Sequence, residues 1–250
     1  VSLVRGNQSE IKAIYDALSP NTQADASTTG KGVDGGQIED SAIIAYRLAS
    51  LINCPVVATG EEDYISDGTR VFAVPHGHPI MTAVTGTGCL LGAVLAAFFS
   101  AYYPCKNRLS MGEFLAYALA YYGLAGESAV HLSGVKPGSF GVAFMDALYT
   151  LDDAVLKSEN RIRPLVVPDQ LEVYFISGTQ DVELNENRLL SIVEDACRGG
   201  VTCFQFREKG AGTLVGQQKL ELAQQLKQIC AKYNVLYVIN DDVDLAMAVN

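Results

Sequence analysis

The most constraining feature of this chain is a pair of closely spaced glycines followed at once by an apolar, alanine-rich run. Gly86 and Gly88 lie one residue apart, and the run from Leu90 to Phe99 follows almost directly. Two such glycines form a turn in which the backbone can approach a ligand closely. The run predicts a buried helix, whose N-terminal N–H groups make an anion site at the mouth of the turn. The alternative interpretation is an ordinary strand–turn–helix with a buried cysteine.

The composition restricts the kinds of partner. The chain has 250 residues, 49% hydrophobic and 18% charged, which allows one or two domains with a substantial core. A net charge of −10 argues against nucleic acid or an anionic membrane as a partner. The longest apolar run, over 89–103, is shorter than the roughly 20 residues that span a bilayer. The six cysteines show no metal-ligand spacing and no signal peptide is recognised, so we expect a cytoplasmic protein with reduced thiols.

The first part of the chain predicts an α/β domain. Apolar periodicity and turn residues indicate a short strand that ends on Arg5 and a hairpin with its turn at Asp67-Gly68. The other predicted elements are helices at 10–18, 41–53 and 111–132 and strands at 56–59 and 70–74. His131, near the end of the last helix, is interpreted as a packing or capping residue.

Four stretches of this part, in this order, resemble hydroxyethylthiazole kinase, a small-molecule kinase of thiamine salvage with a ribokinase-like fold. They are Arg5-Gly6-Asn7 with Glu10, the Gly-rich stretch 30–36, the stretch from Gly77 to Cys89, and the stretch from Pro137 to Leu148. The resemblance covers about residues 1–152 and implies an incomplete, doubly wound α/β layer whose last strand and helix lie at 137–148. Ala83 departs from it, because a basic residue is often expected at that position.

The resemblance also implies roles for individual residues. Arg5 and Thr59 contact ATP, and Glu10 belongs to the magnesium environment. The turn holds the transferring phosphoryl group on backbone N–H groups, and Gly86 also contacts the thiazole; its residues, Gly86, Thr87, Gly88 and Cys89, are the expected catalytic set. Cys89 stands where related sugar kinases carry an Asp base, and its pKa would have to be lowered for that role. The resemblance further implies a homo-oligomer, a trimer.

A change of composition separates this part from the rest. The segment from Asp152 to Gln170 is polar and punctuated by prolines, which predicts a solvated linker over 153–170. Strands at 171–176, 201–207 and 235–240 then alternate with helices at 185–198 and 213–233. This alternation predicts a parallel α/β sheet.

The second predicted strand carries alternating polar and aromatic side chains. Gln205, Arg207 and Lys209 fall on one side, whereas Phe204 and Phe206 point into the helix layer. Polar groups at the C-terminal ends of parallel barrel strands indicate an active site. A salt-bridge network at the rim is the alternative.

The same region resembles thiamine-phosphate synthase, a TIM (β/α)8 barrel that joins a pyrimidine methyl diphosphate to thiazole phosphate. The matching stretches are Gln205 to Lys209 and Ile239 to Ala246, with Gly199 to Thr202 ahead of them. The resemblance covers 171–250, the first three strands of the barrel. It implies a magnesium ligand, Asp241, and a pyrimidine diphosphate site made of Gln205, Arg207, Glu208, Lys209 and Asn240.

We therefore interpret the chain as the middle of a bifunctional transferase of thiamine biosynthesis, in which the C-terminal half of a kinase precedes the N-terminal part of a synthase. Its substrates are small molecules: hydroxyethylthiazole, ATP with Mg²⁺, and hydroxymethylpyrimidine diphosphate. Two alternatives stay open, a ribokinase-like sugar kinase with an unrelated barrel and an inactive binding or assembly module. We expect the chain by itself to lack both activities, to aggregate, and to expose apolar surface at Phe204, Phe206 and Tyr237.

Overall fold

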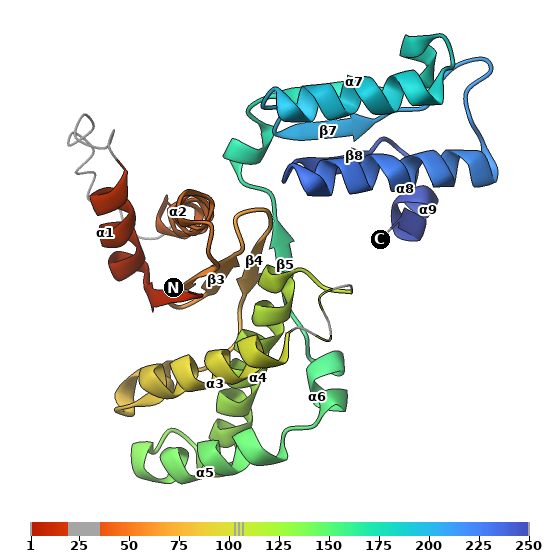
Figure 1. Ribbon diagram of the computed structural model, residues 1–250. Coiled ribbons are helices and arrows are strands. Elements are labelled where there is room, and N and C mark those ends of the chain that lie inside the picture. Colours follow the sequence, from red (N-terminus) through yellow and green to blue (C-terminus); the bar gives the residue numbers. More distant parts are fainter. Residues whose placement is uncertain (1, 20–35, 103, 105, 107, 250) are drawn as a thin grey trace. The chain divides into compact units, whose positions relative to one another are not determined.

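The chain forms two compact units, Val1–Val166 and Val167–Asn250. The computed structural model describes residues 2–19, 36–102, 104, 106 and 108–249 (Figure 1). The Gly-rich stretch 30–36 that resembles the kinase family falls, up to residue 35, outside the described residues. None of the helices in the described part combines the length and apolar character needed to cross a membrane.

The first unit is built on a five-stranded sheet with the order β1-β2-β3-β4-β5. β1 and β2 run parallel and the remaining neighbours are antiparallel. In chain order its elements are β1 (Val4–Asn7), α1 (Gln8–Leu18), α2 (Gly36–Ile52), β2 (Val56–Thr59), β3 (Asp63–Ser66), β4 (Val71–Val74), the 3₁₀ helix η2 (Pro79–Ala83), α3 (Thr87–Ala101), α4 (Met111–Ser133), α5 (Pro137–Thr150), α6 (Asp153–Ser158) and β5 (Arg163–Leu165).

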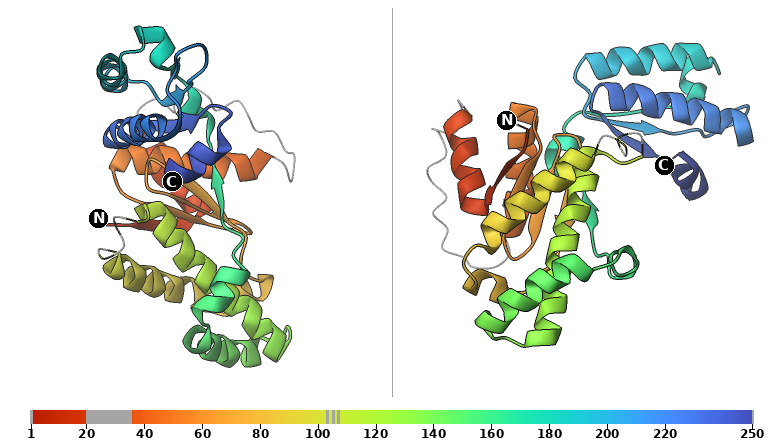
Figure 2. Two further views of the ribbon diagram at one scale, coloured as in Figure 1. Left: turned by 90° about the vertical axis from the view of Figure 1, so that its right-hand side faces the viewer. Right: turned by 60° about the horizontal axis from the view of Figure 1, so that its bottom comes forward.

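Helices α1 and α2 pack on one face of this sheet and α4 on the other, and α3 and α5 pack against α4 (Figures 1 and 2). Side chains of successive strand residues point to opposite faces, so the central strands supply two buried surfaces. Val57, Ile65 and Phe72 face each other in register and join the core made with α4. The alternate residues Ala58 and Tyr64 are equally buried. Helices on both faces agree with the predicted doubly wound arrangement.

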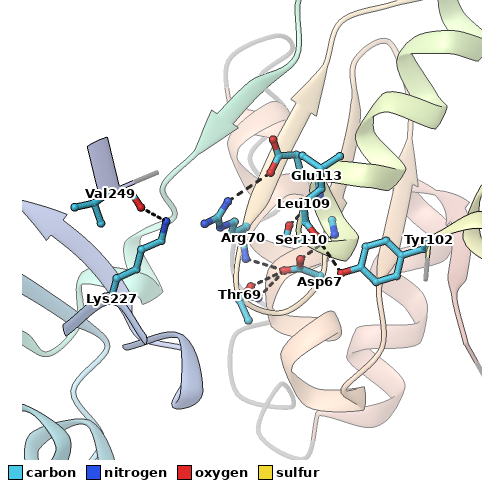
Figure 3. A network of polar contacts seen from close by, with 10 residues as sticks. Asp67, Thr69, Arg70, Tyr102, Leu109, Ser110, Glu113, Lys227 and Val249 are labelled. Carbon is cyan, nitrogen blue, oxygen red and sulfur yellow. Dashed lines mark hydrogen bonds and ion pairs between the residues drawn. The ribbon is translucent and has the colours of Figure 1, made fainter. Parts of the chain in front are cut away.

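The turn of the β3–β4 hairpin is tied to the start of α4 by Asp67 (Figure 3). One carboxylate oxygen accepts the N–H groups of Thr69 (3.1 Å) and Arg70 (2.9 Å), and the other accepts the N–H of Gly112 (2.8 Å). Arg70 also pairs with Glu113 at 3.6 Å. The Asp-Gly signal therefore marks the predicted turn and, in addition, anchors a helix that lies far along the chain.

Local boundaries differ from the sequence-based expectation at both ends of this unit. β1 spans Val4–Asn7 rather than ending on Arg5, because its partner strand begins opposite Val4 and ends opposite Asn7. The predicted last strand at 137–148 is wrong: the whole stretch is helix α5. Pro137 occupies the first helical turn, and Phe140 and Phe144 form a buried stripe at helical spacing.

Helix α3 is buried along one side only. Leu91 and Leu95 enter the core, whereas Ala93, Ala96 and Ala97 are exposed. The predicted buried helix is therefore present, but only one of its sides is buried.

The second unit is a three-stranded parallel sheet, β6-β7-β8, with crossover helices. Its elements are η4 (Pro168–Leu171), β6 (Tyr174–Ser177), η5 (Thr179–Val182), α7 (Glu186–Arg198), β7 (Cys203–Phe206), α8 (Gly216–Lys232), β8 (Leu236–Ile239) and α9 (Val243–Val249). The predicted alternation of strands and helices is confirmed. The complete barrel stays a prediction.

Two expectations about this half of the chain are wrong. Phe204 and Phe206 are buried rather than exposed, because they lie in one core with residues of α7 and α8. The predicted linker is not a plain solvated connection, since it carries α6 and η4 and also β5, which pairs with β4 from Ala73↔Arg163 to Val71↔Leu165. An arginine, a proline and a leucine next to a buried edge strand were enough to extend the sheet.

Candidate functional site

A cavity of about 620 Å³ lies in the first unit where the parallel strands β1 and β2 end. The register Asn7↔Thr59 brings the carboxyl ends of both strands to the same edge of the sheet. That edge is where open α/β sheets bind ligands. The lining residues that bear on the argument are Arg5, Thr59, Asp63, His76, Gly88 and Tyr122.

Arg5 and Thr59, the two predicted ATP contacts, lie side by side on this edge. Arg5 Nη2 lies 3.5 Å from Thr59 Oγ1. The Thr59 hydroxyl donates to the carbonyl of Gly6 at 3.2 Å, which leaves its oxygen lone pairs toward the guanidinium. The arginine is exposed apart from these contacts, so its charge is available to an anion in the cavity.

The turn ahead of α3 carries the predicted anion-binding backbone. Gly86 is the N-cap with φ of +98°, a left-handed conformation that favours glycine. Thr87 Oγ1 donates to the carbonyls of Met81 (2.8 Å) and Val84 (3.1 Å), so this hydroxyl fixes the turn. Within the described residues, the N–H groups of Gly88 and Cys89 have no acceptor.

The guanidinium of Arg5 lies close to Gly88. A Cβ atom on Gly88 would stand 3.3 Å from Arg5 Nη2 and 3.6 Å from Nη1. The start of α3, with its free N–H groups, and the guanidinium of Arg5 thus lie close together, and both attract negative charge. The arrangement can hold a phosphoryl group between strand β1 and helix α3.

Tyr122 of α4 contacts the first residue of α3. Its hydroxyl donates to the Thr87 carbonyl at 2.5 Å, and its ring packs edge-on against Phe144 with centroids 5.0 Å apart. Burial raises the pKa of Tyr122, so the phenol stays a neutral donor at physiological pH. Sequence reasoning did not select this residue, because an aromatic in an Ala-rich helix has no distinguishing spacing.

The structure does not bring every predicted kinase residue to the cavity. Gly86 and Cys89 are absent from its lining, and Cys89 is exposed. Glu10 forms a capping box: its carboxylate accepts the Asn7 N–H at 2.7 Å, and Asn7 Oδ1 accepts the Glu10 N–H at 2.9 Å. Glu10 therefore starts α1 and lies outside the cavity lining. Its part in binding a metal stays a prediction.

Asp63 is a cavity residue that sequence reasoning missed. It is partly buried, and one of its carboxylate oxygens accepts the Gly60 N–H at 2.9 Å. Burial is the main cause that raises its pKa to about 6, while the Gly60 hydrogen bond and the charge of Arg5 act in the opposite direction. The available signal was its position two residues before Ile65 in β3, which places both side chains on the same face of the strand. No group of three or more His, Cys, Asp or Glu side chains suited to a metal ion occurs in the described part of the chain.

The second unit has its own polar hollow, of about 400 Å³, at the carboxyl ends of its strands. Lys209 and Asp241 both line it, and their side chains are in contact. The hydrogen bond and the charge of Lys209 lower the pKa of Asp241. Asn240 also lines it, and its buried Nδ2 donor has no acceptor among the described residues. The lining does not include Gln205 or Arg207, although β7 carries them to the same edge.

Glu208, a predicted ligand residue, uses its carboxylate to accept hydrogen bonds from other residues of the protein. Its carboxylate accepts the N–H of Thr179 (2.5 Å), the hydroxyl of Thr179 (2.9 Å) and the N–H of Leu214 (3.0 Å). It therefore joins the loop after β6 to the loop after β7 and fixes the backbone between Arg207 and Lys209. Its place between two basic residues in the sequence gave no sign of this role.

The first unit is thus an α/β domain with a candidate anion site beside a cavity at the end of a parallel strand pair, the class of site on which small-molecule kinases depend. The chain belongs to the hydroxyethylthiazole kinase family, whose family model matches residues 1–154. A model described as thiamine monophosphate synthase matches residues 173–250.

Individual relatives agree with these two matches. The thiamine biosynthesis bifunctional protein ThiM/ThiE of Symbiobacterium thermophilum is 34% identical over 257 residues, which covers 100% of this chain and 48% of that protein. The hydroxyethylthiazole kinase of Halalkalibacterium halodurans is 39% identical over 162 residues, or 64% of this chain and 57% of the relative. Thiamine-phosphate synthase 1 of Streptococcus pneumoniae serotype 4 is 52% identical over 80 residues, or 32% of this chain and 37% of the relative.

A solved structure is similar as well. The hydroxyethylthiazole kinase protein from Pyrococcus horikoshii OT3 has a TM-score of 0.54 and 30% sequence identity, and the match covers 66% of this chain and 56% of that one. The chain spans about half the length of the curated relatives it matches most fully, 48% and 57% in the first two.

Proposed function

We propose that the first unit phosphorylates the hydroxyethyl alcohol of 4-methyl-5-(2-hydroxyethyl)thiazole with ATP, and that the second unit takes part in coupling the resulting thiazole phosphate to hydroxymethylpyrimidine diphosphate. The observation that carries the kinase half is the convergence of Arg5 with the free N–H groups of Gly88 and Cys89 beside the cavity. Family membership supplies the substrate class.

In the proposed kinase reaction, the alcohol oxygen attacks the γ-phosphorus of ATP and ADP leaves. The charge that develops on the transferring phosphoryl oxygens is stabilised by donors already aimed at it, the N–H groups at the start of α3 and the guanidinium of Arg5. Mg²⁺ enters bound to the nucleotide and offsets phosphate charge. Such an ion keeps water ligands and needs only one or two carboxylates, which Glu61 and Asp63 of the lining can provide. Cys89 follows Gly88 directly and is the candidate acceptor of the alcohol proton.

In the proposed synthase reaction, diphosphate leaves the pyrimidine first and the thiazole nitrogen captures the pyrimidine cation. Arg207 and Lys209 bind the diphosphate, and Asp241 shares its magnesium ion. Gln205 and Asn240 hydrogen-bond the pyrimidine. The unpaired Nδ2 donor of Asn240 supports this assignment, because a buried amide without a partner is destabilising until a ligand supplies one.

The kinase proposal is tested with the full-length gene product, Mg-ATP and a panel of alcohols containing hydroxyethylthiazole and several sugars. ADP formation and the product mass identify the acceptor. We expect phosphorylation of the thiazole alone and at least a hundredfold lower turnover in Arg5→Ala. Arg70→Ala is the matched control, because Arg70 pairs with Glu113 on the surface and lies outside the cavity lining. Preferential phosphorylation of a sugar would favour the sugar-kinase alternative.

The synthase proposal is tested by assaying both activities in Arg207→Ala, Asp241→Asn and the control Arg198→Ala, whose side chain forms an exposed pair with Asp195. The first two variants should lower thiamine phosphate formation and leave thiazole phosphorylation unchanged. Equal loss of both activities would show that these residues support folding rather than chemistry. No turnover by the unaltered protein with either pair of substrates would favour the binding-module alternative.

We also propose that the protein forms a homo-oligomer, as the family resemblance implies. Supporting this, α5 exposes a stripe of apolar side chains on the side opposite its buried phenylalanines. Val142 is 67%, Met145 55% and Tyr149 92% exposed. Spacings of three and four residues place them along one face of the helix. A contiguous exposed apolar stripe of this kind marks an association surface.

A further inference from the structure

The segment after the family-matched region is built into the first unit. The kinase family model ends at residue 154, yet β5 (Arg163–Leu165) continues the sheet by pairing with β4. Arg163 adds an ion pair with Glu62 at 2.5 Å. The chain just before β5 therefore has a fixed course along the first unit.

That course places Arg161 against one wall of the cavity. Its main-chain N–H donates to His76 Nε2 at 3.1 Å. Its guanidinium Nη2 lies 2.5 Å from Glu127 Oε1 and 2.9 Å from His76 Nδ1. One residue thus contacts both nitrogens of an imidazole and the carboxylate beside it.

The groups that Arg161 contacts form the wall itself. His76 and Gly77 line the cavity, and the His76 side chain has no exposed surface. The same oxygen, Glu127 Oε1, accepts the Gly77 N–H at 2.9 Å. Helix α4 backs this wall closely, since a Cβ on Gly123 would stand only 2.5 Å from His76 Cβ. The wall cannot move toward α4, and Arg161 ties it to Glu127 of the same helix.

We infer that Arg161 is a positioning residue of the kinase site, and that the functional kinase unit extends through β5 rather than ending where the family model does. The inference rests on the proposed kinase activity. Arg161 does not line the cavity itself. It acts through His76 and through Glu127, whose carboxylate fixes the Gly77 backbone. Loss of its side chain removes the cationic partner of Glu127, whose Oε1 also accepts the Gly77 N–H, and the wall relaxes.

The test compares Arg161→Ala, Arg161→Lys and the matched control Arg163→Ala in the full-length gene product. Arg163 belongs to the same segment and has an equally short ion pair, but its partner Glu62 does not line the cavity. All three variants keep the main-chain N–H groups, so pairing of β5 is retained. Steady-state kinetics with hydroxyethylthiazole and Mg-ATP give KM and kcat for each.

A second measurement reports the wall without relying on activity. The chain has three histidines, and diethyl pyrocarbonate modification followed by peptide mass mapping distinguishes them. His131 is exposed and serves as the internal reference for His76.

We expect Arg161→Ala to raise at least one of the two KM values about tenfold with kcat within about threefold of normal, and to speed modification of His76 relative to His131 several-fold. Arg161→Lys should restore most of both effects, because its ammonium can still reach Glu127. Arg163→Ala should change neither.

Two results would overturn the inference: unchanged KM values and His76 modification in Arg161→Ala, or equal effects in Arg161→Ala and Arg163→Ala. If the unaltered protein does not phosphorylate the thiazole, the proposed function fails, and the His76 modification rate alone then decides whether Arg161 holds the wall.

Discussion

Replacement of Gly88 is the sharpest test of the anion site, because helix α3 contains its own control. Gly88 and Gly92 both lie in α3. A Cβ on Gly88 would meet Arg5 Nη2 at 3.3 Å, whereas a Cβ on Gly92 would meet nothing within 4 Å. Alanine therefore adds the same atom to the same helix at both positions, and only one of the two additions intrudes on the proposed site.

The expected magnitudes follow from this difference. Replacing a helical glycine by alanine stabilises a helix by about 0.5–1 kcal/mol, so Gly92→Ala should raise the thermal midpoint and leave turnover unchanged. In Gly88→Ala the guanidinium must retreat by a few tenths of an ångström, and we expect a loss of turnover of about tenfold, equivalent to about 1.4 kcal/mol. The branched side chain of Gly88→Val covers the N–H groups themselves. Loss of a preorganised donor costs about 2.7–4 kcal/mol, or at least about a hundredfold in turnover.

ADP formation with hydroxyethylthiazole measures turnover, and thermal unfolding measures stability on the same samples. Thiamine phosphate formation from thiazole phosphate serves as an internal control, since no residue of the second unit is changed. Near-normal turnover in Gly88→Val would remove the turn from the mechanism. A fall in thermal midpoint that parallels the loss of activity would also refute the argument, because the effect would then lie in folding.

Three further predictions use other features of the two units. The pKa of Asp63 is raised from 3.8 to about 6, so the native state binds more protons between these values and stability falls as pH rises through them. Asp63→Asn should therefore raise the free energy of urea unfolding by about 3 kcal/mol at pH 8 and by almost nothing at pH 4; a gain at both would contradict this. Glu208→Gln should reduce thiamine phosphate formation more than tenfold with thiazole phosphorylation unchanged, because the carboxylate no longer accepts both the N–H and the hydroxyl of Thr179; wild-type synthase rates would contradict it. Val142→Asp should shift the mass measured by light scattering toward the monomer, and an unaltered mass would exclude this face of α5 as the interface.

Elements set by local chemistry were predictable from the sequence. Residues close in sequence determine the Asp67-Gly68 turn and the crossover helices of the second unit. They also determine that Phe206 enters the core while its neighbour Gln205 lies on the other face of the strand. Period-two alternation decides which side chains of a strand enter the helix layer, and no distant partner is needed to read it. The same holds for the glycine turn, whose φ of +98° at Gly86 is a local property.

Features that depend on distant partners were not predictable. β5 consists of three residues with a central proline, and it is a strand only because β4 offers an edge. Glu208 was assigned to a ligand because its stretch resembles the synthase motif, but its carboxylate accepts hydrogen bonds from loop residues whose positions only the fold defines. Glu10 was assigned to a metal for a motif that also fits a capping box. A glutamate can bind a ligand or accept hydrogen bonds from the protein backbone, and the sequence does not show which partner lies near it.

The two proposed sites solve the same electrostatic problem differently within one acidic chain. The kinase site relies on backbone dipoles and on Arg5, whose guanidinium has no carboxylate partner among the described residues. The proposed synthase site holds Lys209 against Asp241, and the hydrogen bond and charge of Lys209 lower the pKa of Asp241. A diphosphate that arrives with Mg²⁺ offers a new partner to both members, the anion to Lys209 and the cation to Asp241. The pair can therefore open without leaving either charge uncompensated, whereas a diphosphate without the metal would leave Asp241 facing added negative charge. On this argument we expect the proposed synthase site to bind the magnesium complex of a diphosphate more tightly than the free diphosphate.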